Sequence, residues 1–292
     1  MPRLLPAILA VALSGPALAQ DLVGPGEIAL DGAIARCRGT GPDPVFWSCL
    51  AEAGVPAGGI AFARRLAEDP VIGGPGLMIG FTELGAVDLA EVLFPLLANT
   101  NEQTLFVNGA AGVVQPLALE PQTAGDPQSQ AILAAHPQAF PSLRLAVLGH
   151  RARGSHQRFV ATDAVTDGCR ACPVVAVALT AYVFEAGALN EVTALGWIPP
   201  ALADDEARAT ALAEGDVQAL QVALTLRGYE PGTMDGRPDG ATSRALQQFL
   251  TEFCLPVEAG LGEAALAILS APPPYLDPPP CQPGKEMPRT ND

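Results

Sequence analysis

Apolar residues at helical spacing near the C-terminus constrain the fold of this chain more than any other feature. One face of a predicted helix carries Leu246, Phe249, Leu250 and Phe253, spaced i, i+3, i+4 and i+7. Pro256 follows and ends the helical pattern. A helix this short is marginal in water on its own, so its apolar face must pack against other elements.

Two further short helices are predicted beside it. Asp216 is a suitable N-cap for a helix that ends at Gly228. Turn signals follow at Glu230-Pro231-Gly232 and at Asp235-Gly236, and a third helix is expected over 263–269. Residues 216–270 are therefore predicted to form a small all-α module of three helices around one core.

Many positions of this segment agree, in order and spacing, with one known family. They are Asp216-Val217, Leu220-Gln221, Leu224, Gly228-Tyr229, Pro231-Gly232, Asp235-Gly236-Arg237, Thr242, Ala245-Leu246, Phe249, Leu255-Pro256-Val257, Gly260, Leu266 and Leu269. On these residues the segment resembles the peptidoglycan-binding domain family of three-helix modules. The resemblance implies a three-helix fold and peptidoglycan as the partner.

Three positions depart from the family pattern. Leu250 stands where the family usually has Gln, Asp239 where it has Gly, and Ala265 where it has Thr. The lost polar groups bear on ligand binding more than on the fold.

Peptidoglycan presents sugar rings and short peptides with carboxylates, so its binding needs hydrogen-bond donors, a cation and an aromatic face. The candidates for these roles are Tyr229, Asp235, Gly236, Arg237 and Thr242. The alternative is structural: Tyr229 is half-buried against the helices, and Asp235 and Thr242 only cap.

The first 19 residues have the pattern of a secretory signal peptide. Arg3 precedes a short apolar run over 4–13, and Ala17-Leu18-Ala19 is a cleavage site of the A-x-A type. The run is shorter than the roughly 20 residues that a membrane-spanning helix needs. We expect a periplasmic or secreted product without a membrane span.

Export changes the interpretation of the six cysteines, because an even number in an oxidising compartment favours disulfides. Proximity in the sequence suggests the pairs Cys37–Cys49, Cys169–Cys172 and Cys254–Cys281. Fifteen connectivities are formally open for six cysteines.

Residues 20–200 are predicted to form an α+β domain of unknown function with a mainly antiparallel sheet. The expected elements are an irregular stretch over 20–44, a helix over 56–68, a hairpin at Asn108-Gly109, a helical piece near Ala131, and strands over 143–148, 158–165 and 174–184 and up to Trp197. Residues 89–97 are ambiguous, because their apolar residues have helical spacing but Pro95 would cost a helix a hydrogen bond. An acidic connector (201–215) precedes the module, and a Pro-rich tail (271–292) follows it.

Several wall-enzyme chemistries are excluded by composition. The only lysine is Lys285, in the tail, so no Ser-x-x-Lys acylation pair exists. Gly-x-Ser-x-Gly and His-Glu-x-x-His are also missing from the sequence. The three histidines, His136, His150 and His156, meet no known metal-ligand spacing, so neither a metal nor a cofactor is predicted.

Cys169 and His150 form a weak catalytic pair of the kind that Cys-dependent transpeptidases use. The sequence around Cys169 lacks the Ser and the aliphatic residue of that motif, and Cys172 lies where it can form a disulfide with Cys169 in an oxidising compartment. A redox C-x-x-C is a further alternative, and a structural disulfide at a strand entry is favoured over both.

The net charge of −15 is the wrong sign for a nucleic-acid binder. Within this acidic chain, Arg144, Arg151, Arg153, Arg158 and Arg170 form a local basic cluster. It would suit an anionic ligand or a protein partner, and the alternative is an edge strand protected by charge. Strand alternation would place Arg151 and Arg153 on one face.

Together these patterns favour an exported cell-envelope protein whose N-terminal domain is not catalytic. The alternative is a peptidoglycan-modifying enzyme, either a hydrolase or a Cys-dependent transpeptidase, anchored by the module.

Overall fold

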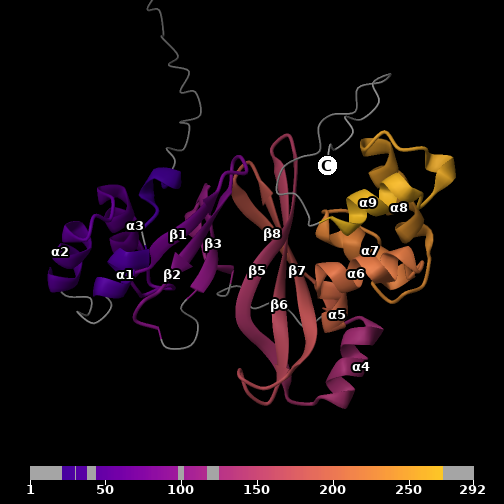
Figure 1. Cartoon of the computed structure of the whole chain (residues 1–292), viewed down its shortest axis with the longest axis horizontal. Helices are drawn as coiled ribbons and strands as arrows, with labels where there is room; N and C mark the ends of the chain where they lie inside the picture. Colours follow the sequence, from indigo (N-terminus) through magenta and orange to yellow (C-terminus); the bar gives the residue numbers. More distant parts are fainter. Residues whose placement is uncertain (1–21, 30, 38–43, 98–101, 117–124, 272–292) are drawn as a thin grey trace, which may run out of the picture.

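The computed structural model describes residues 22–29, 31–37, 44–97, 102–116 and 125–271. The predicted leader and the tail beyond residue 271 lie outside this part of the chain. The described residues form three regions side by side: helices with a first sheet, a second sheet, and a C-terminal group of helices (Figure 1).

The N-terminal region packs short helices on one face of a small antiparallel sheet. Its elements are η1 (Pro25–Glu27), α1 (Asp31–Cys37), α2 (Pro44–Glu52), α3 (Ala57–Glu68), β1 (Leu77–Thr82), β2 (Asp88–Leu93), β3 (Glu102–Gly109) and β4 (Gly112–Val114), with strand order β1-β2-β3-β4. Strand alternation divides the core. Leu105 and Val107 pack with α3, whereas Phe106 between them faces the second sheet.

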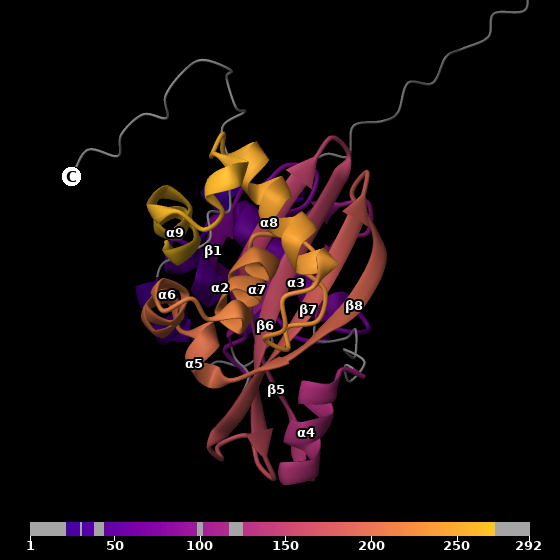
Figure 2. The same cartoon turned by 90° about the vertical axis from the view of Figure 1, so that its right-hand side faces the viewer.

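The second sheet is a four-stranded antiparallel meander that lies at the centre of the molecule. Its elements are α4 (Pro127–Ala135), β5 (Ala139–Arg153), β6 (His156–Asp167), β7 (Val174–Glu185) and β8 (Ala188–Ile198), with strand order β5-β6-β7-β8. On one face, the rings of Phe159 and Tyr182 lie 4.9 and 5.1 Å from the ring of Phe106 in the first sheet. The opposite face is covered by the C-terminal helices (Figure 2).

The C-terminal region consists of helices that share one core with the second sheet. They are α5 (Pro200–Ala203), α6 (Asp205–Ala213), α7 (Val217–Leu226), α8 (Gly240–Glu252), η3 (Val257–Ala259) and α9 (Glu263–Ser270). Val160 and Leu179 of the sheet belong to the same apolar cluster as Leu224 and Phe249 of the module. None of the helices in the described ranges is long and apolar enough to cross a membrane.

The predicted α+β domain with antiparallel sheet and the all-α module are both confirmed, and most strands extend beyond their predicted ends. The undecided residues 89–97 contain all of strand β2 except its first residue, and Pro95 lies beyond the end of the strand. The irregular stretch expected over 20–44 is wrong for residues 31–37, which form α1. Burial of Ile34 and Cys37 against α2 stabilises that helix despite its Gly- and Pro-rich surroundings.

The predicted hairpin exists between β3 and β4, but its turn is displaced. Ala110 and Ala111 form the turn, while Asn108 lies in a bulge of β3 with φ +64°. The buried Asn108 amide accepts hydrogen bonds from the N–H groups of Leu22 and Val23. The left-handed conformation that Asn tolerates is thus used to hold the N-terminal segment rather than to make the turn.

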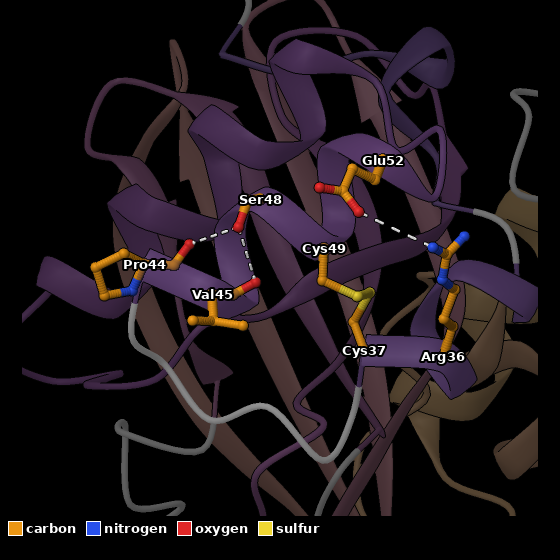
Figure 3. Close-up of a disulfide and its surroundings, with 7 residues drawn as sticks. All are labelled: Arg36, Cys37, Pro44, Val45, Ser48, Cys49 and Glu52. Atoms are coloured by element: carbon orange, nitrogen blue, oxygen red, sulfur yellow. Dashed lines mark hydrogen bonds and ion pairs between the residues drawn. A yellow bond between two sulfur atoms is a disulfide. The ribbon is translucent and has the colours of Figure 1, made fainter.

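Two of the three predicted cysteine pairs are disulfides in the structure. Cys37–Cys49 joins α1 to α2, with the two Cα atoms 5.8 Å apart (Figure 3). Cys169–Cys172 closes the loop between β6 and β7. The third prediction, Cys254–Cys281, includes a residue outside the described ranges and stays a prediction.

Candidate functional site

The candidate surface is the loop between α7 and α8, which carries the predicted residues Asp235, Gly236 and Arg237. Both helices begin at a carboxylate cap. The Asp216 side chain accepts a hydrogen bond from the N–H of Ala219, and the Asp239 side chain accepts one from the N–H of Thr242 at 2.7 Å. These caps satisfy donors that a helix start leaves unpaired and fix where the loop leaves and re-enters the bundle.

A buried amide inside the bundle holds this loop in place. Gln221 on α7 has no solvent exposure. Its oxygen accepts the Gly236 N–H at 2.9 Å, and its nitrogen donates to the Arg237 carbonyl and to the Thr242 hydroxyl, each at 3.0 Å. Gln221 therefore holds the backbone of the loop from beneath, and the outer side of the loop stays open to solvent.

Thr242 belongs to this supporting network. Its hydroxyl donates to the Pro231 carbonyl at 3.0 Å and is also 3.0 Å from a carboxylate oxygen of Asp239. Hydrogen bonds from Thr242 hold the pKa of Asp239 below its usual value. Thr242 is buried, so its hydroxyl is not available at the surface of the module.

Asp235, Gly236 and Arg237 lie at the surface of the module. The Asp235 carboxylate accepts the N–H of Arg237 at 3.0 Å, an Asx-type turn. Gly236 has φ +76°, in the left-handed region that favours glycine. The exposed Arg237 guanidinium offers the planar, paired donors that match a carboxylate.

Tyr229 is placed differently, at the junction between the module and the second sheet. Its ring is buried, and the Arg151 guanidinium carbon lies 4.2 Å from the ring centroid. Its hydroxyl donates to Glu252 at 2.7 Å. Burial raises the pKa of Tyr229, while the nearby Arg151 partly offsets that rise. In this arrangement the ring has no open face for a sugar.

The junction explains most of the basic cluster predicted from the sequence. Arg151 and Arg153, on one face of β5 as alternation predicts, both pair with Glu252 of α8, and Arg151 also donates to the Gly228 carbonyl at 3.2 Å. Arg158 is buried 3.9 Å from Glu230, and burial lowers its pKa. Each of these three residues thus has an acidic partner within the chain. Arg170 lies exposed in the β6–β7 loop, and the Arg144 side chain is outside the described part.

The backbone of β5 lies in close contact with the end of α7 at this junction. Gly149 on β5 lies against the end of α7, where a Cβ would overlap the Leu226 carbonyl oxygen. Gly228, which ends α7 with φ +77°, lies against the Arg151 side chain. The module therefore packs directly against the second sheet, a position that we call seated, and is not separated from the sheet by a flexible connector.

The structure does not bring the weak catalytic pair together. Cys169 is in a disulfide with Cys172, so it has no thiol. His150 is buried on β5 opposite Phe159, and its ring nitrogen lies 3.3 Å from the Gln157 amide. Phe159 precedes the end of β6 by eight residues, which at the rise of a strand is about 26 Å. His150 cannot activate a sulfur at position 169.

The described residues contain no candidate metal-binding site. Among them, no group of three or more His, Cys, Asp or Glu side chains is arranged to hold a metal ion. His136 and His156 each pair with a single carboxylate, Asp167 and Glu185.

The module also agrees with a known family over its whole length. Residues 213–269 match the family described as "Putative peptidoglycan binding domain". The matched range begins at the end of α6 and ends in α9, and the N-terminal two-thirds of the chain has no family match. No curated protein and no solved structure gives a significant match to the chain. The match supports peptidoglycan binding by the module.

The sequence does not reveal the roles of two residues: Gln221, which holds the loop, and Glu252, which joins the module to the sheet. In the sequence, Gln221 appears only as part of the family pattern, and Glu252 belongs to no motif. A buried amide is hard to recognise because Gln is common on exposed helix faces. Two features of the sequence could have indicated that Glu252 pairs with an arginine. It lies one helical turn after Gln248 and off the apolar stripe of α8, and the chain contains a cluster of arginines with no assigned partner.

Proposed function

We propose that this chain is an exported cell-envelope protein that binds peptidoglycan through its C-terminal module, and that its N-terminal domain is not catalytic. The observation that carries the proposal is the family match over 213–269 on a module whose Asp235–Arg237 loop is exposed and held from beneath. The leader pattern of residues 1–19 and the disulfides Cys37–Cys49 and Cys169–Cys172 support export.

The proposed contact surface is the outer side of the loop. Arg237 would pair with a carboxylate of a wall peptide, and Asp235 and Gly236 would give the loop its shape. Tyr229 and Thr242, also candidates from the sequence, would act as supporting residues because both are buried.

Sedimentation with insoluble peptidoglycan tests this function on the full chain. Deleting the module is a poor control, because it would uncover the apolar face around Val160 and Leu179. The informative variant is Arg237→Ala, with Arg64→Ala on α3 as the matched loss of an arginine elsewhere. We expect the full chain and Arg64→Ala to sediment with the wall, and Arg237→Ala to bind about tenfold more weakly. Failure of the unmodified chain to sediment would overturn the proposal.

The alternative that the chain is a peptidoglycan-modifying enzyme is tested by a separate measurement. Purified sacculi incubated with the chain should release no new muropeptides. Release that vanished on substitution of a single Asp, Glu or Cys would replace the non-catalytic assignment with a wall-modifying one.

A further inference from the structure

A second polar site lies where the module meets the second sheet. An open pocket of about 320 Å³ is formed by one residue of β5 and one face of α8. The residues that line it are Arg153, Arg244, Gln247, Gln248, Thr251 and Glu252. Because Arg153 comes from the sheet, this pocket exists only while the module is seated.

The pocket carries excess positive charge in an otherwise acidic protein. Arg151, Arg153 and Arg244 lie in or beside it, and Glu252 is the only acid of its lining. Glu252 is shared between two of those arginines and the Tyr229 hydroxyl. Arg244 is exposed on α8 and forms no ion pair with any described residue. Its charge acts on the Asp239 carboxylate, which is engaged by Thr242.

The polar side chains of the pocket suit the C-terminal end of a peptide. Arg153 keeps 56% of its side chain exposed despite its contact with Glu252, so its guanidinium has donors that face solvent. Beside it, the Gln247 amide can donate to and accept from peptide groups. The Gln248 oxygen, in the amide orientation that fits its neighbours, accepts from Arg151 and Arg153 at 3.2 and 3.3 Å, and its NH2 group is a further donor. A pocket of this size lies at the lower end of small-molecule sites, which favours a terminal carboxylate with one or two residues over a long chain.

We propose that the β5–α8 pocket binds the free terminal carboxylate of a short peptide, with Arg153 and Arg244 supplying the charge. The proposal rests on the proposed function, since peptidoglycan is the source of such peptides, and it adds a second contact that includes the N-terminal domain. Binding at the loop and at this pocket together would strengthen attachment to the wall without a tighter individual contact.

The test uses the full chain and N-acetyl-D-alanyl-D-alanine, compared with the same dipeptide as its C-terminal amide, by calorimetry or chemical-shift titration. We expect the acid to bind and the amide to bind at least about tenfold more weakly. Arg244→Gln should weaken binding of the acid by about tenfold, and Arg153→Gln by a similar factor, whereas Arg170→Gln should leave it unchanged.

Arg244 is the decisive position because, among the described residues, it makes no hydrogen bond or ion pair with the sheet, so we expect its substitution to leave the module seated. Equal binding of acid and amide, no binding of either, or unchanged binding by Arg244→Gln would each overturn the inference. Sedimentation with whole peptidoglycan separates this from failure of the proposed function. If the unmodified chain sediments while the dipeptide acid does not bind, only the pocket is refuted; if the chain does not sediment, the wall-binding function falls.

Discussion

The guanidinium of Arg151, on β5, lies over the ring of Tyr229, at the end of the first module helix, with 4.2 Å between the guanidinium carbon and the ring centroid. Arg151 also donates to Glu252 at 2.5 Å. Arg151, a residue of the N-terminal domain, thus supplies the cation that contacts Tyr229 and Glu252 of the module. This contact makes the second sheet and the helices one structural unit, in which the sheet covers one side of the module and leaves the Asp235–Arg237 loop free.

Arg151→Ala should destabilise the chain by about 2–4 kcal/mol. It removes a largely desolvated cation–π contact and charge-assisted hydrogen bonds, and it leaves Glu252 and the Gly228 carbonyl with fewer donors. Urea unfolding measures the loss. Arg170→Ala, in an exposed loop, is the matched control and should change stability by less than about 0.5 kcal/mol. Equal stability of the two variants would mean that the junction contributes nothing.

Gly149→Ala should act on the same junction through shape alone. The added methyl group would meet the Leu226 carbonyl oxygen, so β5 or α7 would have to shift. Overpacking of this kind costs about 1–3 kcal/mol, occasionally more. Gly125→Ala, where a Cβ meets no atom within 4 Å, should be neutral. A wild-type urea midpoint for Gly149→Ala would show that helix and strand are not in close contact in solution.

The helices of the module could be predicted from the sequence, but the contacts at the junction could not. The helical stripe of Phe249 and Leu250, the N-cap Asp216 and the stop at Gly228 follow from local patterns, and all are confirmed. Long-range partners have no such pattern. Arg151 and Glu252 are separated by 101 positions, and nothing local to either residue indicates the other. For Tyr229 the sequence leaves two roles open, ligand binding or burial against the helices, and only the covering strand with Arg151 decides for burial.

The two disulfides should differ in their contribution and their accessibility. Cys37–Cys49 spans 12 positions and its Cys37 end is fully buried, whereas Cys169–Cys172 spans 3 positions and Cys169 is exposed. Loop-closure entropy predicts losses of about 3 kcal/mol for Cys37→Ser with Cys49→Ser and about 2 kcal/mol for Cys169→Ser with Cys172→Ser. Mild reductant followed by thiol labelling and mass spectrometry should modify Cys169 and Cys172 first. Earlier labelling of Cys37 would contradict the buried placement of α1 against α2.

Asp239 should give the chain an acid-sensitive component of stability. The Thr242 N–H and hydroxyl lower the pKa of its carboxyl in the folded state, so the charged form is favoured by folding. The stabilisation is then fully present above the unfolded value of about 3.9 and is lost as pH falls through the lower, folded pKa. Asp239→Asn keeps a side chain that can cap α8 but cannot titrate, whereas Asp239→Ala loses the cap. We expect Asn to match the wild type near neutral pH and to lose less stability on acidification, and Ala to be less stable throughout. Urea midpoints measured from about pH 7 to about pH 2 report this, and an acid branch for Asp239→Asn as steep as that of the wild type would show that this carboxylate gains nothing on folding.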